Sequence, residues 1–171
     1  EVRDILNSIN SKQEICLHIV TNLEYYQHLG KYRKRSTLDI CRKIFDRTYL
    51  YDWNEQLVST IICACDMALI PISPNDPFAF AKPANKLLLF WKMGMPTLVT
   101  ATPAYERAME QANLDMSCKT TSEWYEKVIK YMGDESARRE VGEKGRAFAD
   151  QHYSAEQAIS RWDDVIRSVL A

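Results

Sequence analysis

Two short apolar runs with little alternation stand out along the chain, at residues 66–72 and 96–100. Both are too short to cross a membrane, and unbroken runs of this length are typical of parallel strands covered on both faces. Between them lie a loop that contains two prolines and a helix that we expect to begin at Pro83 and end at Gly94. The pattern predicts a strand, loop, helix and strand, which together form one βαβ unit of a parallel sheet.

The first part of the chain predicts a helix followed by a strand. Residues 1–10 carry apolar side chains at helical spacing, and residues 14–21 are mostly β-branched or apolar and end in turn-forming residues. His18 lies in this strand, where a lone histidine is more often a hydrogen-bonded core residue than a catalyst. Because a helix comes first instead of a strand, we expect the chain to be part of a larger protein with an upstream domain.

The segment 23–47 is rich in tyrosine and basic residues and has no clear period. It predicts a helix interrupted near Gly30 that resumes over 37–45. The basic cluster in this segment would suit a phosphate or a nucleic acid, although charges around a turn are more often a solvated face. The members of the cluster are Lys31, Arg33, Lys34 and Arg35. A second strand is predicted at 48–53.

Helices fill most of the remaining chain, and each candidate range begins at or just after a residue that accepts hydrogen bonds at a helix N-terminus. Besides the helix of the βαβ unit, they cover residues 55–65, 103–112, 123–131, 134–151 and 154–170, with a short strand at 114–118. The last helix carries an apolar stripe of Ile159, Trp162, Val165, Ile166 and Val169. A terminal helix with so much apolar surface is expected to dock on another surface.

Composition narrows the possible functions. A chain of 171 residues that is 46% hydrophobic can bury one substantial core, so we expect residues 1–171 to form a single domain. The formal net charge of -1 provides no overall field that would attract nucleic acid or an anionic membrane. The odd number of cysteines predicts reduced thiols in a cytoplasmic protein. Cys63 and Cys65 have no second pair at metal-ligand spacing, so we expect them to pack in the core and predict no metal site.

The start of the central helix breaks the usual capping rules. Pro83 suits the first helical position, which places Lys82 at the N-cap, where lysine has no acceptor for the free N–H groups. Lys86 adds a second cation where the helix dipole disfavours positive charge, and Asn85 can donate or accept at the same place. A bound anion would reverse both penalties, so the sequence predicts a phosphate site. The alternative is a hydrated helix start whose lysines extend into water.

The residues around this helix also form a family motif. ACDMALIPIS is followed by Asn85, Lys86, Leu87, Gly94 and Pro96 in the order P-A-N-K-L-L-L-F-W-K-M-G-M-P. This resembles the C-terminal, nucleotide-sugar-binding domain of GT-B glycosyltransferases of the group 4 type, and weaker similarity extends from about residue 14 to the C-terminus. The resemblance implies an α/β, Rossmann-like three-layer domain with a mostly parallel sheet, which is the C-terminal half of a GT-B architecture. Residues 154–170 would then be a docking or crossover helix.

The resemblance also implies a donor-binding site. Four residues at the helix start would lie near the pyrophosphate: Lys82, Pro83, Asn85 and Lys86. Three residues of the preceding loop would lie near the donor sugar: Asn75, Asp76 and Phe78. Asp52 and Trp53, at the corner after the second strand, would lie near the base.

By this resemblance the protein transfers a sugar from a nucleotide-diphosphate donor to an unknown acceptor. The nucleotide sugar is its substrate, and no cofactor, bound metal or nucleic acid is expected. Catalysis in the family requires the cleft to an N-terminal acceptor domain, so we assign no catalytic residue here and expect this domain to be inactive alone. No transmembrane segment is predicted.

One departure from the family motif leaves a second function open. The family often has two glutamates eight residues apart, the second of which holds the ribose, and the matching positions are Ala81 and Leu89. Neither side chain can hold a ribose. The alternative is therefore a non-catalytic Rossmann-like interaction module, whose partner would dock on the terminal helix. A GT-B-like sugar epimerase is disfavoured because the loops contain no evident pair of carboxylates.

Overall fold

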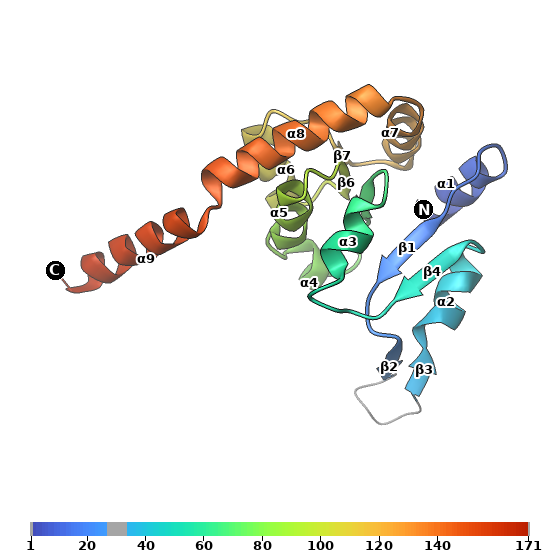
Figure 1. Ribbon diagram of the computed structural model, residues 1–171, viewed down its shortest axis with the longest axis horizontal. Helices are drawn as coiled ribbons and strands as arrows, with labels where there is room; N and C mark the ends of the chain where they lie inside the picture. Colours follow the sequence, from blue (N-terminus) through green and yellow to red (C-terminus); the bar gives the residue numbers. More distant parts are fainter. Residues whose placement is uncertain (1, 27–33, 171) are drawn as a thin grey trace. The chain divides into compact units, whose positions relative to one another are not determined.

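The computed structural model describes residues 2–26 and 34–170, and the contacts between residues divide the chain into two units, 1–65 and 66–171 (Figure 1). Each unit contains parallel strands joined by helices. The predicted α/β class with parallel pairing is therefore confirmed. Each sheet within the described residues has only two or three short strands.

Unit 1 alternates short strands with helices. Its elements are α1 (Val2–Asn10), β1 (Leu17–Val20), β2 (Glu24–Tyr26), β3 (Lys34–Ser36), α2 (Thr37–Ile44), β4 (Thr48–Tyr51) and α3 (Val58–Cys63). Strands β1 and β4 pair in parallel, with Leu17 opposite Thr48. The apolar side chains that are buried in this unit come from α1 and from α2 with the residue after it, and are Ile5, Leu6, Ile9, Cys41 and Phe45.

The tyrosine-rich segment corrects one expectation. The predicted helix before Gly30 is wrong at Glu24–Tyr26, which forms β2 and pairs antiparallel with β3 (Lys34–Ser36). Tyrosine favours strands, and the Nζ of Lys34 lies 2.7 Å from the Oε2 of Glu24 across the pair. The helix that resumes after this pair is confirmed as α2. Gly30 itself, with Lys31 and Arg33 of the basic cluster, lies outside the described residues.

Unit 2 contains the central βαβ unit. Its elements are β5 (Ala68–Ile70), α4 (Pro77–Phe80), α5 (Asn85–Lys92), β6 (Thr97–Thr100), α6 (Pro103–Gln111), β7 (Ser117–Cys118), α7 (Thr121–Gly133), α8 (Glu135–His152) and α9 (Ala155–Leu170). The strands lie in the order β5-β6-β7, and both pairs are parallel. The prediction of strand, helix and strand is confirmed, and one turn of helix, α4, lies within the segment predicted as an irregular loop.

The core of unit 2 includes a close contact between α5 and α8. Trp91 of α5 is buried, and its ring meets that of Phe148 edge to face at a centroid distance of 5.7 Å. At Gly142 of α8 an added Cβ would lie 2.2 Å from the carbonyl oxygen of Gly94, and at Gly145 it would lie 2.8 Å from Cδ1 of Trp91. The two glycines therefore allow α8 to approach α5 and the turn that ends it.

Several helices begin at residues other than those predicted. Helix α5 begins at Asn85 instead of Pro83, and α3 begins at Val58 instead of residue 55. The side chain of Asn54 does accept hydrogen bonds, from the backbone N–H groups of Gln56 and Leu57, but it caps a turn that precedes α3. Shifts of this size are common because the first turn of a helix is the part least determined by local sequence.

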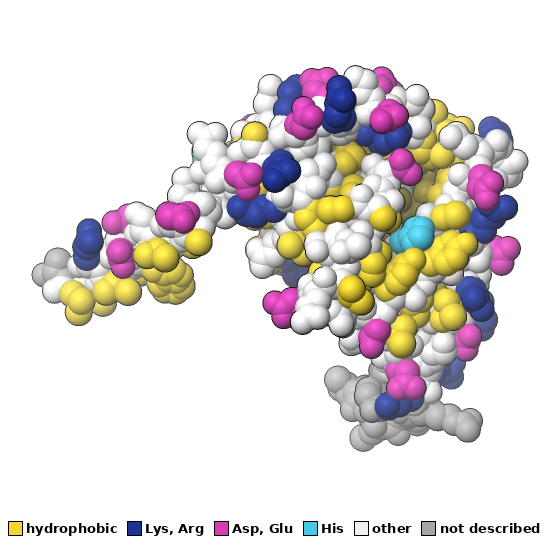
Figure 2. All heavy atoms as spheres, viewed as in Figure 1, with side chains coloured by type: hydrophobic (Ala, Val, Ile, Leu, Met, Phe, Trp, Pro, Cys, Tyr) yellow, Lys and Arg dark blue, Asp and Glu magenta, His cyan; other side chains and the backbone are white. Residues whose placement is uncertain are grey.

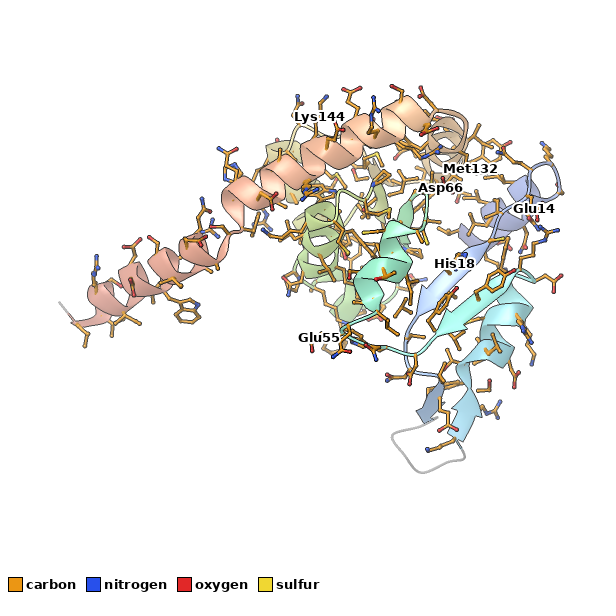
Figure 3. All side chains as sticks on the ribbon, in the orientation of Figure 1. Glu14, His18, Glu55, Asp66, Met132 and Lys144 are labelled. Atoms are coloured by element: carbon orange, nitrogen blue, oxygen red, sulfur yellow. The ribbon has the colours of Figure 1, made fainter. Side chains whose placement is uncertain are left out.

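Arg138 joins the end of α7 to the beginning of unit 2. Its Nη1 donates to the carbonyl oxygens of Tyr131 and Met132, at 2.7 and 3.1 Å, and its Nη2 lies 3.3 Å from Oδ1 of Asp66. Asp66 and Met132 are labelled in Figure 3. Carbonyl groups at a helix C-terminus lack partners within the helix, so one mostly buried guanidinium satisfies two of them.

The five cysteines differ in their exposure. Cys16 and Cys63 are exposed, Cys65 is partly buried, and Cys41 and Cys118 are buried. The expectation that Cys63 packs in the core is therefore wrong, because α3 leaves its side chain open to solvent. Burial raises the pKa of the Cys118 thiol to about 12, and it also raises the pKa of Cys41.

These exposures predict the order in which the thiols react with iodoacetamide. The thiolate is the reactive form, so Cys16 and Cys63 should be alkylated in the native chain. Cys41 and Cys118 should be alkylated only after unfolding in urea, because burial both shields them and disfavours their thiolates. Peptide mass spectrometry after a timed reaction measures this order. Alkylation of Cys118 in the native chain as fast as that of Cys16 would contradict the structure.

No helix among the described residues is both long enough and apolar enough to cross a lipid bilayer.

Candidate functional site

The candidate site begins where β5 and β6 end. The backbone N–H of Ile72 donates to Oγ1 of Thr100, with the two atoms 2.8 Å apart, so the carboxyl ends of the two strands are held together. The chain that leaves β5 here continues through α4 into α5. In open parallel sheets this edge is where ligands bind.

The predicted donor-sugar residues lie at and around α4. Asp76 is the N-cap of α4, and its Oδ1 accepts a hydrogen bond of 3.0 Å from the backbone N–H of Ala79. The carboxylate of Asp76 is therefore engaged in holding the short helix in place. Phe78 is 86% exposed, and Asn75, three residues earlier, is exposed too. Asn75 and Phe78 thus present an amide and an aromatic ring to solvent.

The start of α5 lacks a capping side chain. The N-cap residue is Ala84, which makes no side-chain hydrogen bond to the helix. The expectation that Lys82 is the N-cap and Pro83 the first helical residue is wrong, because α5 begins two residues later, at Asn85, with Ala84 as its N-cap. The physical consequence is unchanged, since alanine, like lysine, has no acceptor. The first backbone N–H groups of α5 have no side-chain acceptor from the N-cap.

Two cations lie close to this uncapped start. Lys86 is the second residue of α5 and Lys82 precedes the helix, and both side chains are exposed. Among the described residues neither lysine takes part in a recorded ion pair. Burial of Leu87 and Trp91 in the core fixes the rotation of α5, so the opposite face, which carries Lys86, is open. Asn85 is also exposed at the first position.

The family's carboxylate positions are accessible but apolar. Ala81 is exposed at the end of α4, and Leu89 is 52% exposed on α5. The first turn of α5 contains no acidic residue. Ala81 and Leu89 therefore place no carboxylate at these two exposed positions.

Asp52 and Trp53 belong to unit 1, directly after β4. Oδ1 of Asp52 accepts a hydrogen bond of 3.1 Å from the backbone N–H of Trp53, and the Trp53 ring is 57% exposed. The structure thus places the loop and helix residues of the candidate site in unit 2 and the two corner residues in unit 1.

His18 is not the core residue that was expected. It is exposed on β1, as Figure 3 shows, and its Nδ1 lies 3.0 Å from the hydroxyl oxygen of Tyr51 on β4. Its ring also stacks on that of Tyr49, at a centroid distance of 5.0 Å. The parallel register, in which His18 faces Tyr49, brings these rings to the same face of the sheet.

Unit 2 also has a pocket that the sequence did not indicate. Its volume is about 740 Å³, and charged side chains of α6 and α7 and of the residues flanking β7 dominate its lining. None of the predicted site residues lines it. The charged lining residues are Glu106, Glu110, Asp115, Lys119, Glu123 and Lys127. The pocket could not be predicted from the sequence, because charged residues are common on the exposed faces of helices.

The charges of this pocket mostly satisfy one another. Nζ of Lys119 lies 2.8 Å from Oε1 of Glu106, and this hydrogen bond raises the pKa of Lys119. Lys127 pairs with Asp115 and donates to the carbonyl oxygen of Ser117 at 2.8 Å. These pairs fasten α6 and α7 to the residues around β7 and engage four of the six charged lining residues, while Glu123 accepts a hydrogen bond from the backbone N–H of Lys119.

Comparison of the chain with protein-family models, with curated proteins and with solved structures found no match.

Proposed function

We propose that the chain is the donor-binding domain of a glycosyltransferase, which transfers a sugar from a nucleotide-diphosphate donor to an acceptor that is still unknown. In this proposal it is a Rossmann-like three-layer domain and the C-terminal half of a GT-B architecture. The observation that carries the proposal is the uncapped start of α5, which lies with two exposed lysines on the chain that leaves the carboxyl edge of a parallel sheet.

Electrostatics supports an anionic ligand at this start. The N-terminus of a helix carries about half of a positive elementary charge, and its free N–H groups point outward along the axis. Lys86 adds a full charge in the first turn of α5, and Lys82 adds another just before it. Hydrogen bonds to a charged group each contribute about 1.5–3 kcal/mol, so a diphosphate would be held by several such interactions.

The same groups suit the chemistry of transfer. As the bond between the anomeric carbon and the donor oxygen breaks, the electron pair stays on the leaving diphosphate, while an acceptor oxygen bonds to the anomeric carbon. Lys86 and the N–H groups of α5 would stabilise the negative charge that grows on the diphosphate. Asn75 and Phe78 would contact the sugar. The nucleophile and any general base would come from the acceptor domain.

Ala81 and Leu89 stand where the resembling family has carboxylates, and this affects which part of the donor would be recognised. With Leu89 at the ribose position, recognition would depend on the diphosphate more than on the nucleoside. We therefore expect UDP and GDP to bind with similar affinity, and CMP, which carries a single phosphate, to bind more weakly.

Removal of one lysine tests the site. Isothermal titration calorimetry of the 171-residue chain with UDP, GDP and CMP should show binding of the two diphosphates. Lys86→Ala should raise their dissociation constants at least about tenfold, because a charge-assisted contact to the diphosphate is lost.

Lys144→Ala is the matched control. Lys144, labelled in Figure 3, lies on α8 and pairs with Glu140 at 2.7 Å, so its loss removes the same charge away from α5. The dissociation constants of the Lys144→Ala variant for UDP and GDP should equal those of the unaltered chain. Absence of heat with every nucleotide, from a chain whose circular dichroism shows that it is folded, would overturn the proposal.

A second candidate function is a Rossmann-like interaction module without donor binding. One observation favours it: α9 buries none of its residues and exposes the apolar stripe predicted from the sequence. Ala81 and Leu89 are consistent with loss of a donor site. A folded chain that ignores every nucleotide but still associates through α9 would support this candidate over the first.

A further inference from the structure

Helix α9 exposes a continuous apolar face that nothing in the described chain covers. Its six large apolar residues are between 51% and 82% exposed. They are Ile159, Trp162, Val165, Ile166, Val169 and Leu170. Figure 2 shows apolar side chains gathered along one side of this helix and charged ones along the other. Apolar surface of this extent on a single helix marks an interaction site.

The spacing along α9 fits a helix as the partner. Ile159, Trp162, Ile166 and Val169 are separated alternately by three and four residues. Alternation of three and four is the period with which one helix packs side chains between those of another. The Ser154 hydroxyl oxygen accepts a hydrogen bond of 3.2 Å from the backbone N–H of Gln157, so the helix has a defined start before this face begins.

The area of the face is sufficient for a stable dimer. Tryptophan alone has about 150–250 Å² of accessible surface, and Trp162 and the five aliphatic residues are each more than half exposed, so the open area of the face is of the same order as one side of a standard interface. A standard protein interface buries about 800 Å² on each partner. Two copies of the α9 face, placed against each other, reach that size with few further contacts.

The charges of the chain favour a second copy over a membrane surface. The polar side of α9 carries more acidic than basic residues, namely Glu156, Asp163 and Asp164 against Arg161 and Arg167. Helices that lie on anionic bilayers are instead rich in lysine and arginine on that side. The chain as a whole has a formal net charge of -1, so two copies repel each other little.

We propose that the apolar face of α9 pairs with the same face of a second copy of the chain to form an isologous dimer. An antiparallel arrangement sets Trp162 of one copy against Ile166 of the other, and Ile159 against Val169, so that apolar side chains meet at each level. The inference develops the interaction surface of the second candidate function and does not depend on donor binding, since α9 contains none of the proposed donor residues.

The test is the mass of the chain in solution as a function of concentration. Light scattering after size-exclusion chromatography should give twice the monomer mass of 19.8 kDa at high concentration and the monomer mass on dilution. Trp162→Glu places a charge in the middle of the face and should raise the dissociation constant of the dimer about a hundredfold or more. Ser160→Glu adds the same charge on the opposite side of α9 and should leave the dissociation constant unchanged.

Three outcomes would overturn the proposed dimer. They are a monomer at every concentration, aggregates of no defined mass, and association that Ser160→Glu weakens as much as Trp162→Glu does. Circular dichroism of both variants verifies that α9 remains helical. The nucleotide titrations above are independent of this result, because a monomeric chain that binds UDP would refute the dimer and leave donor binding intact.

Discussion

Gly142→Ala is expected to lower the free energy of unfolding of the chain by about 3 kcal/mol. The added methyl carbon would lie 2.2 Å from the carbonyl oxygen of Gly94 and 3.1 Å from its carbonyl carbon. These are backbone atoms of the turn that ends α5, and Gly94 holds this turn with a φ of 70°. Neither helix can relieve the clash by turning a side chain, so α8 must move away from α5 and leave the core less well packed.

Urea denaturation followed by circular dichroism measures this loss. Gly133→Ala is the matched control, because nothing lies within 4 Å of a Cβ at Gly133, the last residue of α7. Alanine favours helix over glycine by up to about 1 kcal/mol, so this control should be neutral or slightly more stable. Equal stability of the Gly142→Ala and Gly133→Ala variants would show that α8 and α5 do not approach each other as described.

Trp91→Leu is expected to destabilise the chain by about 2–4 kcal/mol and to abolish the destabilising effect of a second substitution, Gly145→Ala. Trp91 is 1% exposed and lies against Phe148, so the smaller side chain leaves a cavity between α5 and α8. Gly145→Ala alone should also destabilise, because its Cβ would lie 2.8 Å from Cδ1 and 2.9 Å from Cγ of the Trp91 ring. In the Trp91→Leu chain the ring is absent, and Gly145→Ala should cost nothing.

A double-mutant cycle measures this coupling. The free energies of unfolding of the two single variants and of the double variant should differ from additivity by about 1–3 kcal/mol, with the double variant more stable than the sum predicts. Additive effects of Trp91→Leu and Gly145→Ala would contradict the contact. The cycle tests the packing of α5 from the side opposite to Lys86, and so tests what holds the proposed phosphate site in place.

The central βαβ unit was predictable because its signals are local. Two unbroken apolar runs, a proline before the helix and Gly94 after it determine the order of elements without reference to the rest of the chain. The position of the helix start was less determined. Proline is favoured at the first helical position, but Pro83 instead lies two residues before the first helical residue, Asn85.

The glycines of α8 show what sequence alone could not reveal. On helix propensity Gly142 and Gly145 only weaken α8. Their structural reason is contact with Gly94 and Trp91, which lie far away in sequence. A local pattern carries no information about such a partner. The pocket lined by Glu106 and Lys127 could not be predicted either, because it forms only when α6 and α7 lie beside β7.

The candidate site was predictable in part. Sequence identified a helix start without an acceptor and with cations beside it, and in the structure both lysines are exposed there. It did not reveal that Asp76 is engaged as the cap of α4, because that short helix depends on tertiary packing more than on its own sequence. For His18, an apolar strand suggested burial on both faces, whereas one face of the β1 and β4 pair leaves the imidazole exposed.

The contact of α5 with α8 also affects how the chain is made. Synthesis proceeds from the N-terminus, so Leu87 and Trp91 leave the ribosome well before Gly145 and Phe148 are available to cover them. During that interval Leu87 and Trp91 are exposed to solvent, and chaperones or neighbouring nascent chains can bind to them. Unit 2 can complete its core only after α8 has emerged, so its folding is delayed until Gly145 and Phe148 are outside the exit tunnel.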